Sequence, residues 1–306
     1  MAETPTPPAS SKALVFARRS LSTLILWAMV AGIFASHKSW AYLGLIGVLA
    51  IIATLEYFRM LRTAGVACFP RFGLLMAAGY CCALHWFFLQ GKTPPPDLDA
   101  LAVFLVLAGS FTLQLRYQIR GVESLLAVAA NVLGFVYVAV MFNFAARVLF
   151  VVPDAMPVAG TVSEHGAYLL LWLLAVTKFT DMGAYLVGSM IGRHKMIPHV
   201  SPGKTWEGFG GALLFAQLAG CGLYLMFPAR LSEFRNLGHV VVLGFLLAVL
   251  AVVGDLAESI VKRTLHAKDS GRMLPGIGGS LDLIDSVCFT APAVYFYLKW
   301  FLLPIA

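Results

Sequence analysis

The chain has 306 residues, of which 60% are hydrophobic and only 12% are charged. Soluble domains carry about 25% charged residues, so a chain this long and this apolar requires lipid around it. The formal net charge of +7 does not indicate nucleic-acid binding, because basic residues of membrane proteins gather in cytoplasmic loops. The five cysteines form no CxxC pair and mostly lie in apolar runs, which favours buried thiols over disulfides or zinc ligands.

Apolar runs predict an all-α polytopic integral membrane protein with about nine transmembrane helices. Residues 1–20 are polar and rich in Pro and Ser, so we expect a disordered cytoplasmic tail. Residues 21–165 carry few polar side chains and form the expected N-terminal transmembrane scaffold, and residues 166–306 form the expected C-terminal transmembrane catalytic region. The predicted spans lie near residues 21–36, 40–58, 72–90, 100–115, 122–145, 166–191, 208–227, 238–261 and 285–303.

Lysine and arginine orient these spans. With a cytoplasmic N-terminus, 15 basic residues fall in inside segments and 5 in outside segments, while Lys178 and Lys299 lie within spans. This asymmetry supports an N-in, C-out topology and places both polar segments described next on the cytoplasmic side. The small chain with minimal extensions favours the inner (cytoplasmic) membrane of a bacterium.

The first polar segment begins inside an otherwise apolar span, at Lys178 and Asp181. These residues are three apart on one helical face. Charges at membrane depth are costly and normally face a cavity or a partner. The pair therefore indicates a polar cavity, and a structural ion pair between the two residues is the alternative.

The same segment continues into Ser201-Pro-Gly-Lys204-Thr. This stretch looks like the end of a P-loop, but Pro198 stands where the motif needs glycine, and no strand is expected before it. Gly203 still frees backbone N–H groups and Lys204 adds charge, so the loop suits an anionic phosphate. A basic loop that merely follows the positive-inside rule remains the alternative.

The second polar segment begins at Gly254. On a helix, Asp255, Ser259 and Lys262 share one face, with Glu258 and Arg263 beside it.

A short loop with Lys268 and Asp269 and a glycine-rich stretch follow. We expect Ser280 to cap the last helix, which places Asp282 in the first turn and Asp285 on the same face.

Carboxylates from two helix ends, together with lysines and an arginine, suit nucleotide phosphates. Mg²⁺ prefers such hard oxygen ligands and usually bridges protein carboxylates to substrate phosphates. Carboxylates that simply pair with neighbouring cations as solvated loop charges are the weaker alternative, because many carboxylates and glycines crowd one hairpin.

The two segments together resemble the phosphatidate cytidylyltransferase (CDP-diacylglycerol synthase) family. That family's signature runs roughly S-x-x-K-R-x4-K-D-x-[GSA]-x2-[LIF]-[PG]-x-H-G-G-x-x-D-R-x-D, and residues 259–285 follow it closely. The upstream elements also match, from Asp181-x-x-Ala-Tyr185 to Ser201-Pro-Gly-Lys-Thr-x-Glu207-Gly. Two positions depart from the pattern, because Ile277 stands where the family usually has His and Leu283 where it usually has Arg.

The resemblance implies a reaction and a site. A phosphatidic acid oxygen would attack the α-phosphorus of CTP, giving CDP-diacylglycerol and pyrophosphate. By motif position, Asp255 and Asp282 would hold Mg²⁺, with Asp285 as a further metal contact and K⁺ as a further cation. We expect the remaining site residues to contact CTP or lipid phosphate or to shape the cavity: Lys262, Arg263 and Lys268, and Ser201, Lys204, Glu207, Ser259, Asp269 and Asp181.

Other functions stay open at this point. A CTP-dependent transferase acting on a different lipid, or an inactive family member, would carry similar residues. A CDP-alcohol phosphotransferase would need an Asp-Gly-x-x-Ala-Arg element, which is absent from the sequence. A transporter would favour internal inverted repeats, and we find none. The oligomeric state is also open, a homodimer included.

Overall fold

The computed structural model describes residues 28–152, 160–267, 269–271 and 278–303. The expected tail at residues 1–20 lies outside this part of the chain. Residues 28–36 are helical, and the start of the predicted span at 21–36 also lies outside the described residues. The further elements are α2 (Ser39–Thr63), α3 (Pro70–Leu89), α4 (Leu98–Gln114), α5 (Val122–Gly134), η1 (Phe135–Val140), α6 (Met141–Leu149), α7 (Glu164–Ile191), β1 (Lys195–Ile197), β2 (Ser201–Thr205), α8 (Trp206–Met226), η3 (Ser232–Phe234), α9 (Leu237–Thr264), α10 (Ser280–Tyr297) and η4 (Leu298–Leu302).

The chain is an all-α polytopic membrane protein. Among the described residues, seven helices are long and apolar enough to cross a membrane, and each coincides with a predicted span. Continuous helix joins α5, the π-helical η1 and α6 into one span, and α10 continues into η4. The predicted span at 100–115 is the 17-residue helix α4, which at 1.5 Å per residue reaches only about 25 Å. The number of nine spans and the N-in orientation stay predictions.

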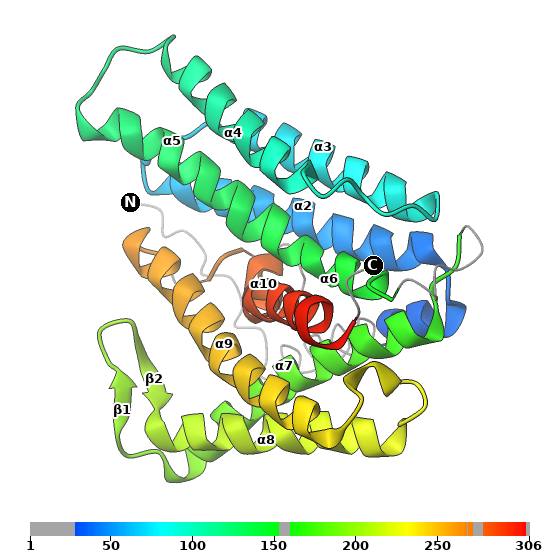
Figure 1. Cartoon of the computed structure of the whole chain (residues 1–306). Coiled ribbons are helices and arrows are strands. Elements are labelled where there is room, and N and C mark those ends of the chain that lie inside the picture. The colour runs from blue at the N-terminus through cyan, green and yellow to red at the C-terminus, as the bar shows by residue number, and fades with distance from the viewer. Residues whose placement is uncertain (1–27, 153–159, 268, 272–277, 304–306) are drawn as a thin grey trace, which may run out of the picture.

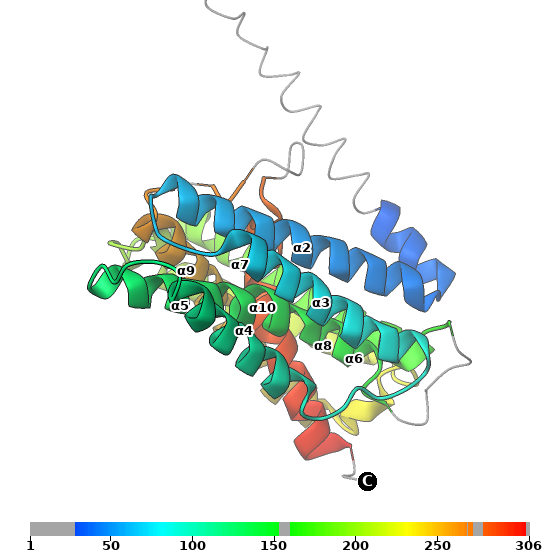
Figure 2. The ribbon, with the colours of Figure 1, turned by 90° about the horizontal axis from the view of Figure 1, so that it is seen from above.

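Helix α10 lies at the centre of the molecule. It contacts α2 and α6 on one side and α7 and α9 on the other. In Figure 1, α2 to α6 form one layer and α7 to α9 form the other, with α10 between them. Figure 2 shows the same arrangement from above. The helix that begins in the second polar segment is therefore surrounded by both halves of the chain.

Glycines allow the helices around α10 to approach closely. A methyl group on Gly183 of α7 would lie 2.6 Å from the carbonyl oxygen of Gly211 on α8. A methyl group on Gly254 of α9 would lie 2.9 Å from the carbonyl oxygen of Asp285 on α10. Small residues at helix contacts are typical of membrane proteins, since close backbone packing replaces the hydrophobic effect there. The Gly254 contact brings the next residue, Asp255, up to α10.

A two-stranded antiparallel hairpin, β1–β2, joins α7 to α8. The sequence predicts no strand here, because the stretch from Lys195 to Thr205 is short and interrupted by two prolines. Thr205 then caps α8, its Oγ1 accepting a hydrogen bond from the backbone N–H of Gly208 at 3.1 Å. The hairpin lies beside α8 and near the end of α9 in Figure 1.

Candidate active site

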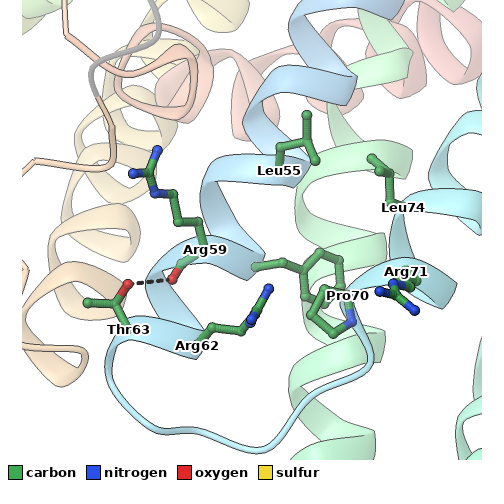
Figure 3. Close-up of a pocket in the computed structure, with 8 residues that line it drawn as sticks. Leu55, Arg59, Arg62, Thr63, Pro70, Arg71 and Leu74 are labelled. Atoms are coloured by element: carbon green, nitrogen blue, oxygen red, sulfur yellow. Dashed lines mark hydrogen bonds between the residues drawn. The ribbon is translucent and has the colours of Figure 1, made fainter.

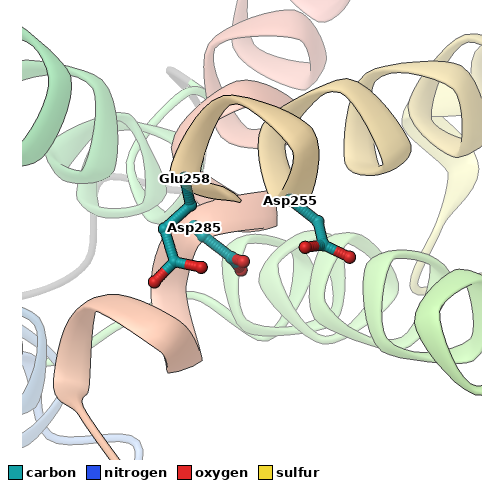
Figure 4. A group of neighbouring side chains, drawn as sticks. All are labelled: Asp255, Glu258 and Asp285. Atoms are coloured by element: carbon teal, nitrogen blue, oxygen red, sulfur yellow. The ribbon is translucent and has the colours of Figure 1, made fainter. Parts of the chain in front are cut away.

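Three carboxylates meet where α9 lies against α10. Asp255 and Glu258 belong to α9 and Asp285 belongs to α10, and one oxygen of each lies within 4.8 Å of the others (Figure 4). Glu258 is 1% exposed and Asp285 is 6% exposed. Like charges held this closely away from water repel each other strongly unless a cation lies among them.

Lysines from three elements surround these carboxylates. Lys204 of β2 places its Nζ 2.9 Å from Asp255 Oδ2 and donates to the Val252 carbonyl oxygen at 3.2 Å. Lys262 of α9 forms ion pairs with Glu258 and, at 2.9 Å, with Asp282 Oδ1. Asp282 is thus linked to the three carboxylates through a shared lysine.

The pair in α7 completes the polar region. Lys178 Nζ lies 3.6 Å from Asp181 Oδ2 and donates a hydrogen bond to the Leu283 carbonyl oxygen at 2.9 Å. Asp181 accepts a hydrogen bond from Ser286 of α10 at 3.4 Å. Both members of the expected ion pair therefore also tie α7 to α10.

We define the acidic cluster as Asp181, Asp255, Glu258, Asp282 and Asp285. Among the residues that the structure describes, its five carboxylates face three lysines, an excess of two negative charges when all these groups are ionised. Oε1 of Glu258 is buried and accepts no hydrogen bond from any residue in the described part of the chain. An all-oxygen donor set with uncompensated charge suits a hard divalent cation such as Mg²⁺.

Asp282 lies in the first turn of α10, as the sequence predicts. The N-cap residue is Gly279 rather than Ser280, and Asp282 Oδ2 accepts the Gly279 backbone N–H at 3.0 Å. Ser280 begins the helix and its hydroxyl donates to the Leu49 carbonyl oxygen of α2 at 3.1 Å. The Asp282 side chain thus caps the start of α10 by accepting a backbone N–H.

A residue of the N-terminal half also contacts this helix start. Glu56 of α2 is 1% exposed, and its Oε2 accepts the Leu281 backbone N–H at 3.0 Å. A methyl group on Gly271 or Gly279 would lie 2.2 Å or 2.9 Å from its carboxylate oxygens. Glu56 is not among the residues predicted for the site, although a carboxylate in an apolar span is a recognised signal of function.

Glu207 binds the base of the hairpin. It accepts hydrogen bonds from the backbone N–H groups of Arg193 and His194, at 3.1 and 3.2 Å, and lies 2.6 Å from His194 Nδ1. Ser201 is the first residue of β2 and pairs with Ile197. Glu207, in the first turn of α8, therefore binds the residues that precede β1.

The other predicted site residues lie around the end of α9. Ser259 is half-buried on α9, while Arg263 and Asp269 are exposed. Lys268, Arg272 and Ile277 lie outside the described residues. Glu258, rather than Asp282, joins Asp255 and Asp285 in the closest group. Its position three residues after Asp255 puts both on one helix side, which is the sequence signal for this group.

These features define a polytopic membrane protein with a polar, carboxylate-rich site between its last helices. The chain belongs to the cytidylyltransferase family, whose model matches residues 17–301.

Curated relatives agree with this family. A phosphatidate cytidylyltransferase of Mycobacterium bovis is 31% identical over 273 residues, covering 84% of this chain and 80% of the relative. One of Haemophilus influenzae is 40% identical over 134 residues, covering 44% of this chain and 46% of the relative. One of Bacillus subtilis is 36% identical over 140 residues, covering 46% and 51%. The shorter matches span about half the length of these last two relatives.

Proposed function

We propose that this protein is a phosphatidate cytidylyltransferase, which transfers CMP from CTP to phosphatidic acid in phospholipid biosynthesis. The observation that carries the proposal is the acidic cluster with its lysines, in a membrane chain of the cytidylyltransferase family. The names of the relatives support the two substrates. An anionic nucleotide and an anionic lipid can be brought together only where cations offset their charges.

The proposed reaction is a nucleotidyl transfer. An oxygen of the phosphatidic acid phosphate forms a bond to the α-phosphorus of CTP, and the bond between that phosphorus and the bridging oxygen breaks. Pyrophosphate leaves with the bond's electron pair, and CDP-diacylglycerol remains. A phosphate monoester is largely ionised at neutral pH, since its second pKa is about 6. The nucleophile therefore needs little help from a general base, and positioning and electrostatics dominate.

The acidic cluster is the proposed metal site. Asp255, Glu258 and Asp285 supply the closest set of oxygens. Asp282, the second metal ligand implied by the resemblance, is linked to this set by its ion pair with Lys262. A bound Mg²⁺ would orient the phosphates and offset developing charge. K⁺ as a further cation remains an expectation from the resemblance.

The lysines are the proposed phosphate contacts. Lys204 and Lys262 each bind a carboxylate of the cluster, so their ammonium groups already lie at the edge of the metal site. Arg263 is exposed at the end of α9 and is able to contact a nucleotide that approaches from the loops. Ser201, Ser259 and Asp269 keep their predicted substrate-binding roles, and Lys268 keeps its predicted catalytic role of offsetting phosphate charge.

The proposed location is the inner membrane of a bacterium, with the site facing the cytoplasm, where CTP is made. The hairpin and the end of α9 carry Arg193, Lys195, Lys204, Lys262 and Arg263, and such basic ends favour the cytoplasmic side. A homodimer stays an expectation from the sequence.

The test is CDP-diacylglycerol formation by purified full-length protein with CTP, Mg²⁺ and phosphatidic acid in mixed micelles. We expect turnover that EDTA abolishes and added Mg²⁺ restores. Parallel reactions replace phosphatidic acid with other lipid phosphates, such as a polyprenyl phosphate. Turnover with another lipid alone would replace the proposed substrate, and no turnover by folded protein with any lipid would overturn the proposed function.

A further inference from the structure

A second polar region lies away from the acidic cluster, where α2 ends and α3 begins. An open pocket of about 610 Å³ is lined there by eight residues at the end of α2 and the start of α3. Figure 3 shows three arginines around it: Arg59 and Arg62 of α2 and Arg71 of α3. Its volume lies within the range of small-molecule sites, about 300–1,000 Å³.

The three arginines carry uncompensated positive charge. Arg59, Arg62 and Arg71 are all exposed, and none forms an ion pair with any residue that the structure describes. The positive-inside tendency explains basic residues at the ends of spans. It does not explain why three arginines from two helices line the same pocket. Guanidinium groups bind phosphate oxygens in a bidentate manner, which makes this an anion site.

The rest of the lining is apolar. Leu55, Phe58 and Leu74 form the wall towards the middle of the two spans. The Phe58 ring is fixed against α3, because a methyl group on Gly73 would lie 2.1 Å from it. A free phosphate makes no contact with such a wall. A phospholipid does, because its headgroup is anionic and its chains are apolar.

The pocket also adjoins the helix that contacts the proposed active site. Arg59 follows Glu56 by three residues on α2, a rise of roughly 4.5 Å. Glu56 accepts the Leu281 N–H at the start of α10. Arg59 is therefore one helical turn along α2 from the residue that contacts the start of α10.

We propose that Arg62 and Arg71, with Arg59 at the edge of the pocket, first bind the phosphate monoester headgroup of the lipid substrate before it moves to the acidic cluster, with its acyl chains against Leu55 and Leu74. The identification of that lipid as the substrate rests on the proposed function. The binding of a phosphomonoester lipid does not. Arginine side chains bind phosphate oxygens in pairs, unlike lysine side chains. They therefore favour a doubly charged phosphate monoester over the singly charged phosphate diester of other phospholipids.

The experiment measures lipid binding to full-length protein in detergent by native mass spectrometry. The probes are dioleoyl phosphatidic acid, dioleoyl phosphatidylglycerol, dioleoyl phosphatidylcholine and inorganic phosphate. The test variant is Arg62→Gln/Arg71→Gln, and Arg62→Lys/Arg71→Lys keeps the charge but removes the bidentate geometry. The matched control is Arg116→Gln/Arg120→Gln, which removes two exposed arginines outside the pocket.

We expect the wild type and the control to bind phosphatidic acid most tightly and phosphatidylcholine most weakly. The Gln variant should lose at least about tenfold in affinity for phosphatidic acid, and the Lys variant should lose less. Affinity within twofold of the wild type in a folded Gln or Lys variant would overturn the site. Equal binding of phosphatidylcholine, or displacement of the lipid by millimolar inorganic phosphate, would overturn the lipid assignment.

Kinetics separate this inference from the proposed function. The Gln variant should raise the KM for phosphatidic acid about as much as it weakens binding, while the KM for CTP stays unchanged. Arginine-dependent binding in a protein without any CTP turnover would reject the proposed function and retain the lipid site. Lost binding with an unchanged KM for phosphatidic acid would show that the bound lipid is not the substrate, which would overturn that part of the inference.

Discussion

The two halves of the chain differ in whether their buried charges are balanced. In the N-terminal half, Arg147 lies 2.6 Å from Asp99, and Tyr80 donates to the same carboxylate at 2.8 Å. One acid therefore meets one base and one hydroxyl. In the C-terminal half, the five carboxylates of the acidic cluster meet three lysines of the described residues.

This difference separates stability from function. A balanced pair inside a membrane protein lets α4 and α6 hold together without leaving a charge exposed to lipid. An unbalanced group costs folding free energy, and a protein retains it where a ligand supplies the missing charge. Substitutions in the two regions should therefore give opposite results in stability and in turnover.

The largest effect is expected at Asp255. Asp255→Asn removes one charge from the proposed metal site, whose electrostatic contribution is several kcal/mol, so turnover should fall by about 10³-fold or more. The measurement is CDP-diacylglycerol formation over a range of Mg²⁺ concentrations, with the midpoint of thermal unfolding as the control for folding. A folded variant with near wild-type rates would remove Asp255 from the metal site.

Asp99→Asn should show the reverse pattern. It leaves Arg147 without its carboxylate, and breaking a buried ion pair costs about 3 kcal/mol. We expect a lower midpoint of thermal unfolding but turnover per folded molecule within about threefold of the wild type. A large loss of turnover at unchanged stability would contradict the division between the two halves.

Glu56 is the expected exception in the N-terminal half. Glu56→Ala leaves the Leu281 N–H without its acceptor and opens space beside Gly271 and Gly279. We therefore expect kcat to fall by about 10- to 100-fold, the loss typical when a residue that orients metal ligands is removed. Glu56→Gln keeps an acceptor of the same shape and should restore most of the rate. A parallel loss in both variants with unchanged Mg²⁺ dependence would assign Glu56 a direct chemical role instead of a positioning one.

The smallest effect is expected at the two positions that depart from the family signature. Because the nucleophile is already ionised and the cluster with its lysines supplies most of the electrostatics, an Ile277→His/Leu283→Arg double variant should change turnover by less than about threefold. The assay compares both proteins with CTP, Mg²⁺ and phosphatidic acid. An inert natural protein beside an active double variant would identify this chain as a degenerate family member.

Much of this architecture could be predicted from the sequence because the signals are local. Runs of about 20 apolar residues predicted each of the seven long helices, and the spacing after Gly254 predicted that Asp255 and Asp285 lie in helices with nearby lysines. The contact between Glu56 and Leu281 joins residues 225 apart, and no local pattern reports such a pairing. The sequence does not predict the hairpin β1–β2, because its strands are too short to show the alternation of polar and apolar residues that is typical of a strand.

The glycines at the start of α10 have a consequence for how variants of this chain would be classified. Gly279 has no room for a side chain, because a methyl group there would meet the Ser270 hydroxyl and the Glu56 carboxylate. Gly203, in contrast, has nothing within 4 Å of that position. A harmful substitution of Gly279 would thus disrupt the packing between the two halves of the chain. Although Gly279 belongs to the motif, such a result would not be evidence that the backbone of the motif contacts phosphate. The same substitution at Gly203 meets no steric obstacle. A loss of activity in that variant would therefore be more direct evidence that Gly203 lies close to the ligand.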